Sequence, residues 1–161
     1  MNHRNLIVVG VDGSPGSRRA LRWALGEAER SNAELAAVTV WTWDGLEGAM
    51  LAATNPTTQR EHAERVSAHE VGSAVAEHGA PVRVNRTVVE GHSVRELLDA
   101  SRHARLLVVG GSGHGRLHRT ALGSISAECA RRARCPVVVV PDDETAGTKP
   151  SPDGTVGTVT R

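Results

Sequence analysis

Aromatic residues are almost absent from this chain of 161 residues, which holds no tyrosine, no phenylalanine and three tryptophans. Proteins that bind single-stranded nucleic acid stack bases on aromatic side chains, so such a surface is not expected here. An excess of one charge is also lacking, because 19 lysines and arginines stand against 18 aspartates and glutamates. With a net charge of +1, neither nucleic acid nor a membrane is an expected partner.

Cysteine is scarce as well, since Cys129 and Cys135 are the only two. Their spacing fits neither a zinc site nor a redox pair, which predicts two reduced, mostly packed thiols.

Near the N-terminus the chain has only a short apolar run, from Leu6, which meets the charged Asp12 almost at once. This run is too short for a signal peptide or a membrane span, so we expect a cytoplasmic protein.

The length of the chain fits one domain. We expect this domain over residues 1–141. Residues 142–161 hold mainly Gly, Thr, Pro, Ser and Asp without an apolar period, which predicts a disordered C-terminal tail.

Short apolar runs rich in β-branched residues alternate along the chain with helical patterns. Expected strands cover residues 6–11, 35–40, 82–89, 106–109 and 136–140, and expected helices cover 15–31, 58–79, 93–101 and a segment that begins at 124. Apolar strands without alternation are typical of a parallel sheet that is covered on both faces. Strands and helices in alternation therefore predict an α/β protein with a doubly wound, parallel sheet of five strands.

Two serines are expected to mark helix starts. Ser14 is followed by Pro15, the arrangement of an N-cap residue and a first helical residue. Ser93 and Glu96 have the spacing of a capping box.

Glycine is concentrated after the fourth expected strand, at positions 110, 111, 113 and 115, and Gly123 and Ser124 form a second turn before a helical pattern. Glycine lets backbone N–H groups approach a ligand closely, and a helix N-terminus offers unpaired N–H donors with a partial positive charge. Ser124 is placed to cap this helix or to donate its hydroxyl to a phosphate. The stretch predicts an anion site, most naturally one for phosphate.

Three familiar templates fail at this stretch. A Walker A loop needs lysine and then serine or threonine at the positions of Arg116 and Leu117. A dinucleotide fingerprint needs glycine or alanine at the position of Arg116 or His118. A nucleophile elbow needs glycine at the position of His114. The chemistry that each template would bring is therefore not predicted.

One spacing fits throughout: Gly110, two residues, Gly113, nine residues, Gly123 and Ser124. It resembles the nucleotide-binding motif in the ATP-binding branch of the universal stress protein family. The stretches VVGVDGS, AELAAVTV and CPVVVV fall where that family has its first, second and last strands. The resemblance covers about the first 141 residues and implies a Rossmann-like sheet of strand order 3-2-1-4-5. In such a sheet the ligand lies where the strand order reverses, between the first and fourth strands.

The resemblance also implies a set of nucleotide contacts. These positions are Val11, Asp12, Gly13, Val40, Gly110, Gly113, Gly123, Ser124 and Ile125. In the family the residue that matches Asp12 contacts the nucleotide, and the valine that matches Val40 offers its backbone to adenine. A carboxylate in the place of Asp12 also suits magnesium. The alternative from the residues alone is that Asp12 is a capping or turn aspartate and Val40 a core residue.

As a function, the resemblance implies an ATP-binding stress-response or regulatory module, with Mg²⁺ as the accompanying ion. One alternative is a cyclic AMP sensor or buffer, and a more distant one is an adenylate-handling enzyme of the same broader fold. Such an enzyme calls for a catalytic lysine or a serine- and glycine-rich loop after the first strand, whereas this chain has a single lysine, Lys149. Without a phosphate-loop lysine or an evident base, at most slow ATP hydrolysis is expected.

The last expected strand, Pro136–Val140, forms an apolar edge of the sheet. Soluble monomers avoid such edges, so we expect a cover over it. Family members commonly dimerise through this strand in antiparallel register, which implies a homodimer. The alternative is that the C-terminal tail folds over the strand.

Overall fold

The computed structural model describes residues 5–43, 56–111 and 122–141. In chain order, its elements are β1 (Leu6–Gly10), α1 (Pro15–Ser31), β2 (Glu34–Trp41), α3 (Pro56–His78), β3 (Val84–Glu90), α4 (Ser93–Ala100), β4 (Leu106–Gly110), α5 (Ser124–Arg132) and β5 (Val137–Val140). The tail expected over residues 142–161 lies outside the described residues.

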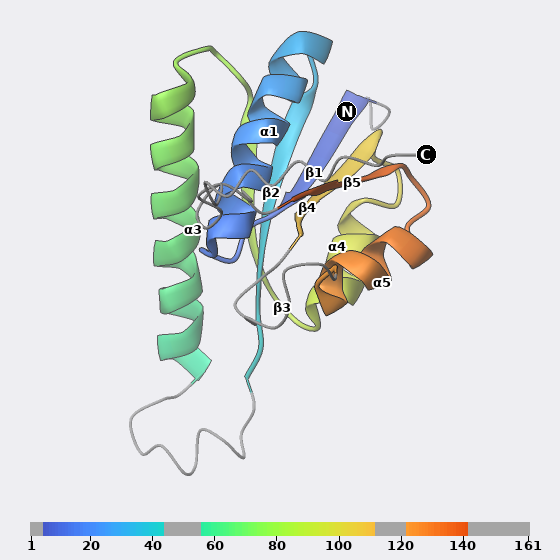
Figure 1. Ribbon diagram of the computed structural model, residues 1–161. Helices are drawn as coiled ribbons and strands as arrows, with labels where there is room; N and C mark the ends of the chain where they lie inside the picture. Colours follow the sequence, from blue (N-terminus) through green and yellow to red (C-terminus); the bar gives the residue numbers. More distant parts are fainter. Residues whose placement is uncertain (1–4, 44–55, 112–121, 142–161) are drawn as a thin grey trace, which may run out of the picture.

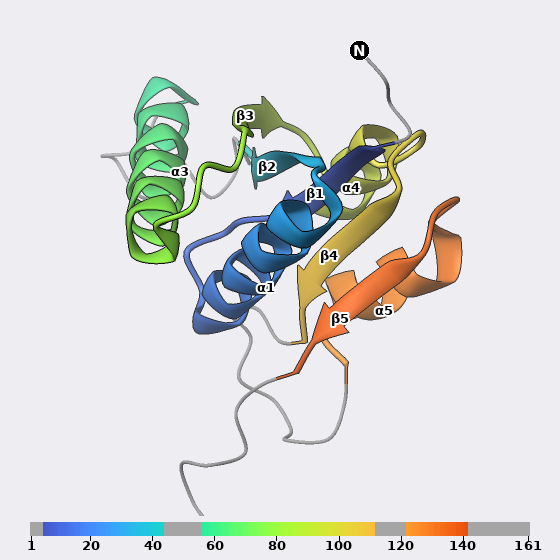
Figure 2. The same ribbon diagram turned by 90° about the horizontal axis from the view of Figure 1, so that it is seen from above.

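All neighbouring strands pair in parallel. The strands form one sheet in the order β3-β2-β1-β4-β5. Helices α1 and α3 cover one face, and α4 and α5 cover the other (Figures 1 and 2). The predicted doubly wound sheet and its strand order are confirmed. The chain leaves β1 first toward β3 and then toward β5, so the order reverses between β1 and β4.

The strand bounds differ by a few residues from those predicted. The third strand, expected over residues 82–89, runs from Val84 to Glu90. Its start is set by pairing, because Leu35 of β2 lies opposite Val84, and Val82 instead donates its N–H to the carbonyl of Ala80 in a turn. A partner strand that is distant in sequence thus determines where β3 begins.

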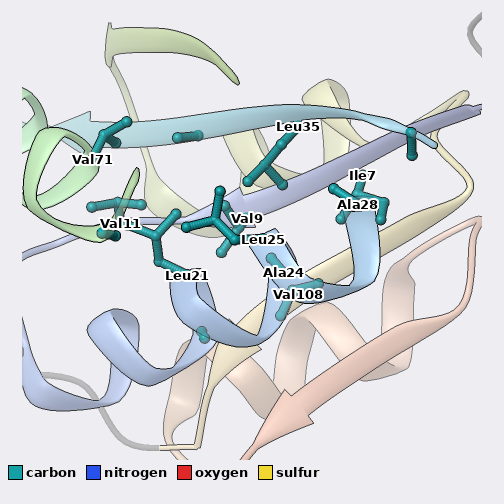
Figure 3. Packing of buried hydrophobic residues seen from close by; sticks show 14 residues of the cluster. Ile7, Val9, Val11, Leu21, Ala24, Leu25, Ala28, Leu35, Val71 and Val108 are labelled. Carbon is teal, nitrogen blue, oxygen red and sulfur yellow. The ribbon is translucent and has the colours of Figure 1, made fainter. Parts of the chain in front are cut away.

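Two cores fill the two sides of the sheet. Side chains of successive strand residues point to opposite faces. Ile7 and Val9 therefore pack with Leu21 and Leu25 of α1 (Figure 3). Val8 lies in the second core with residues of α4 and α5, among them the fully buried Cys129. Burial raises the pKa of the Cys129 thiol to about 11, and both cysteines are free thiols, as expected.

The two predicted helix caps have different outcomes. The Oγ atom of Ser14 accepts a hydrogen bond of 3.1 Å from the N–H of Ser17, and α1 begins at Pro15, so the first cap is confirmed. The prediction of a capping box at Ser93 is wrong. The N–H of Glu96 donates to the carbonyl of His92, which makes His92 the N-cap residue, and no side chain caps the helix.

Candidate functional site

A cavity of about 450 Å³ lies at the carboxyl ends of the strands, on the side of α4 and α5. It is bounded by the β1–α1 loop, the end of β2, the start of α4, the end of β4 and the first turn of α5. The lining residues are Gly10, Val11, Asp12, Ser14, Ser17, Val38, Val40, Ser93, Leu97, Val109, Gly110, Gly123, Ser124, Ile125 and Ser126. Because β1 and β4 are where the strand order reverses, this is the position at which open α/β sheets bind ligands.

Hydrogen bonds within the loop after β1 fix one wall of the cavity. An Oδ1 atom of Asp12 accepts from the N–H of Ser14 at 2.9 Å, and the N–H of Asp12 donates to Ser17 Oγ at 3.3 Å. Between them, Gly13 has a φ of +80°, a left-handed conformation that favours glycine. The loop is therefore held in one shape by its own sequence.

Contacts to the end of β4 fix the opposite wall. The N–H of Gly111 donates to the carbonyl of Val140 at 2.7 Å, and the N–H of Gly123 donates to the carbonyl of Gly111 at 2.7 Å. Gly123 is the N-cap residue of α5 and, having no side chain, makes no side-chain capping bond to the first turn of this helix. The prediction that α5 begins at Ser124 is confirmed, but the prediction that Ser124 caps it is wrong, because Ser124 already lies inside the helix.

Gly110 brings the two walls together. A Cβ atom at this position would lie 2.6 Å from the carbonyl carbon of Gly16 in the first turn of α1. Only glycine permits this approach of two backbones. As a result, the N-termini of α1 and α5, each with the partial positive charge of a helix start, face the same cavity.

The remaining wall of the cavity is apolar. Val38, Leu97 and Val109 belong to the second core and are each 4% exposed. Val40 packs against the same core, and Ser93, the first residue of α4, adds a hydroxyl at this end. The cavity thus suits a ligand with a flat apolar part and an anionic part.

The structure places most of the sequence-predicted site residues at this cavity. Val11, Asp12, Val40, Gly110, Gly123, Ser124 and Ile125 line it. Gly13 lies in the β1–α1 loop between two lining residues but does not itself line the cavity. Gly113 lies outside the described residues.

Several lining residues were not predicted from the sequence, among them Ser17, Ser93, Leu97 and Ser126. The sequence did contain a signal for Ser17. This residue lies three positions after the predicted cap Ser14, where the N–H group donates the capping hydrogen bond. Leu97 is a core residue of α4, and its place beside the cavity depends on the crossing of α4 over the sheet. The bond of Ser126 to Gly111 had no local signal, because Gly111 lies fifteen positions earlier in the chain.

Asp12 is the candidate for holding a metal ion. Among the described residues that line the cavity, Asp12 has the only carboxylate. Magnesium is commonly bound by one or two carboxylates together with phosphate oxygens and water, so this donor set fits the ion only with a phosphate-bearing ligand. Within residues 5–43, 56–111 and 122–141, no group of three or more His, Cys, Asp and Glu is placed to hold a metal alone.

The fold and the site define a doubly wound α/β protein with a cavity at its switch point, onto which the start of α5 faces. The family model described as "Universal stress protein family" matches residues 3–141. A universal stress protein of Mycobacterium tuberculosis (strain ATCC 25618 / H37Rv) is 34% identical over 139 residues, which cover 83% of this chain and 44% of the relative. The chain belongs to the universal stress protein family, and it spans about half the length of the curated relatives it matches.

Solved structures of the family are similar to this chain. One is a universal stress protein in complex with cAMP, with a TM-score of 0.64 and 26% identity over 86% of this chain and 97% of the other. A universal stress protein from Lactobacillus plantarum has a TM-score of 0.68 and 22% identity over 87% of this chain and 99% of its own, which supports the fold. Within the described part of the chain, no helix is both long and apolar enough to span a membrane.

Proposed function

We propose that this protein binds ATP together with Mg²⁺ and acts as a stress-response or regulatory module. The observation that carries the proposal is the N-terminus of α5, which is capped by Gly123 and opens on a cavity whose far end is apolar. The first turn of a helix leaves N–H groups without a backbone partner. Because the cap residue has no side chain to accept from this turn, a phosphate is the natural partner for these groups.

In this proposal the triphosphate lies against Gly110, Gly113, Gly123 and Ser124, and the adenine lies at the apolar end beside Val40. The backbone of Val40 is the adenine contact. Val11, Gly13 and Ile125 complete the contacts with the nucleotide. Asp12 holds Mg²⁺ against the phosphates, which is the only chemistry that the ion supplies there.

Binding alone is sufficient for a regulatory role. The chain has one lysine, Lys149, which follows the matched family region. Rapid phosphoryl transfer relies on positive groups that neutralise charge in the transition state and on a group that orients the attacking water. We therefore propose a switch that is set by nucleotide occupancy in the cytoplasm, with at most slow hydrolysis.

Cyclic AMP is the second candidate ligand. The solved universal stress protein in complex with cAMP is 26% identical to this chain over nearly all of its own length. A single phosphate at the first turn of α5 would use the same N–H groups, and the apolar end accepts the same base. Cyclic AMP has fewer phosphate oxygens to share with an ion at Asp12, so its binding is expected to depend less on Mg²⁺.

A calorimetric titration with ATP, ADP, AMP and cyclic AMP, each with and without Mg²⁺, tests the proposal. We expect micromolar ATP binding that Mg²⁺ strengthens, and loss of binding in Gly113→Val. Gly115→Val is the matched control, because this glycine lies in the same segment but outside the motif spacing. If cyclic AMP binds more tightly than ATP, the second candidate replaces the first; if no nucleotide binds, both are wrong.

We further propose that two copies form a homodimer through Pro136–Val140. β5 is an edge strand, and its four valines are only half-buried. The carbonyls of Pro136 and Val140 accept hydrogen bonds from β4 and its extension. Since backbone groups alternate in direction along a strand, the N–H groups of Val137 and Val139 point to the open edge.

This alternation allows a sharp test of the dimer. Val139→Pro removes one outward N–H without removing a bond to β4, whereas Val139→Ala shortens the same side chain and keeps the N–H. Sedimentation is expected to show a dimer for the wild type and for Val139→Ala, and a monomer for Val139→Pro. A monomeric wild type would contradict the proposed dimer without affecting the nucleotide site.

A further inference from the structure

The hydroxyl of Ser126 connects α5 to the end of β4 and has no role in the nucleotide contacts proposed above. Ser126 is 2% exposed. Its Oγ lies 2.9 Å from the carbonyl oxygen of Gly123 and 3.2 Å from the carbonyl oxygen of Gly111. A hydroxyl has one proton, so this donor is shared between the two carbonyls.

The backbone groups of Gly111, which directly follows β4, form hydrogen bonds to the end of β5 and to the start of α5. Gly111 donates its N–H to Val140 at the end of β5, and its carbonyl accepts the N–H of Gly123. Ser126 is a second donor to the same carbonyl. The start of α5 is therefore tied to β4 by one backbone bond and one side-chain bond.

A glycine cap makes this second bond important. At most helix starts the cap side chain fixes the first turn, as Ser14 does for α1. Gly123 has no side chain to do so. Ser126 ties the same turn to the sheet from inside the helix, and it leaves the N–H groups at the helix start open to a ligand.

We propose that Ser126 is a positioning residue that holds the first-turn N–H groups of α5 in place for an anionic ligand, the phosphate of a nucleotide. This inference rests on the proposed function and names a residue outside the motif. Donor groups that are fixed before binding cost little ordering on binding, whereas a looser turn weakens each N–H contact with phosphate. The base at the apolar end does not depend on this turn.

Binding of ATP, AMP and adenosine to Ser126→Ala, measured by titration, tests the inference. Loss of one neutral hydrogen bond predicts an affinity about fivefold weaker for ATP and AMP. For adenosine, which has no phosphate, the affinity should stay within about twofold of the wild type. Ser126→Thr keeps the hydroxyl and should restore phosphate binding.

Ser101→Ala is the matched control. Ser101 is 1% exposed and donates its hydroxyl to the carbonyl of Leu98 at the end of α4, away from the cavity. Its loss should leave all three affinities unchanged. In the ligand-free protein, hydrogen exchange of the Gly123 amide should be faster in Ser126→Ala than in the wild type, which reports on the turn itself.

The outcomes separate the two proposals. A wild type that binds ATP and a Ser126→Ala variant that binds it equally well would overturn this inference alone. Equal losses for ATP and adenosine, or an unchanged exchange rate at Gly123, would also overturn it and indicate a general structural role. A wild type that binds none of the three ligands would overturn the proposed function and the phosphate role together.

Discussion

Two helices, α1 and α5, point their N-termini at the same cavity. They differ in whether a side chain accepts hydrogen bonds from the N–H groups of the first turn. At α1, the first residue is proline, which has no N–H, and the N–H of Ser17 is donated to the hydroxyl of Ser14. At α5, the cap is Gly123, which has no side chain to accept from the first turn. The dipoles of the two helices are alike, but only α1 has a side-chain cap at its start.

This difference shows that a helix start facing a cavity is not by itself an anion site. The residue at the cap decides whether the first-turn N–H groups donate to a side chain of the protein or to a bound ligand. In the proposed function, α1 shapes the wall of the cavity, whereas α5 offers the donors. The following variants test that division of roles.

The largest effect is expected for Gly110→Ala, which separates the two helix starts. The new Cβ would lie 2.6 Å from the backbone of Gly16, so α1 and β4 must move apart. We expect a loss of about 3 kcal/mol in the free energy of unfolding, measured with denaturant. Gly26→Ala is the control, since a Cβ there has no atom within 4 Å and should stabilise α1 by about 0.5 kcal/mol. Equal stability of the two variants would contradict the close approach.

Giving α5 a cap of its own should make it resemble α1. Gly123 has a φ of −57° and a ψ of 155°, which any residue can adopt, so the backbone there does not require glycine. We expect Gly123→Asn to weaken ATP binding about threefold, because its side chain competes for the same N–H groups. Gly123→Asp adds charge repulsion and should weaken ATP binding about a hundredfold. Titration of both variants measures the two contributions, and unchanged ATP affinity in Gly123→Asp would refute the role assigned to α5.

Removing the cap of α1 should lower the stability of the protein and leave its ATP affinity nearly unchanged. Ser14→Ala deletes the acceptor for the N–H of Ser17, which should lower the free energy of unfolding by about 1 kcal/mol. ATP affinity should stay within about twofold of the wild type, because α1 is not assigned a phosphate contact. Denaturation and titration of the same variant check both parts. A loss of affinity as large as that of Gly123→Asp would show that the two helix starts share the ligand.

The sequence was sufficient for the fold because each strand and helix has a local pattern, and the resemblance to the family supplied the order of the strands. The cap at Ser14 was predictable, since a serine followed by proline leaves little choice of helix start. At Ser93 the pattern of a capping box was misleading, because the preceding residue, His92, provides the carbonyl that begins the helix.

For the site, the sequence predicted part of the cavity lining but not the contacts that bring it together. Gly110 was interpreted as a ligand contact, and the structure adds that Gly16 leaves no space for a side chain there. Ser126 was missed because its bond to Gly111 exists only after α5 folds back against β4. Contacts between segments distant in the chain are not contained in a local pattern.

The smallest expected effect compares the two helix starts without any mutation. Pyrophosphate added to the ligand-free protein should shift the NMR signals of the Ser124 and Ile125 amides, since these N–H groups begin α5 and the cap residue, Gly123, has no side chain to accept from them. The Ser17 amide should not shift, because Ser14 already accepts from it. Sodium chloride at equal ionic strength controls for general screening. Equal shifts at both helices would mean that the cap of α1 opens readily, and that the cavity does not distinguish its two helix starts.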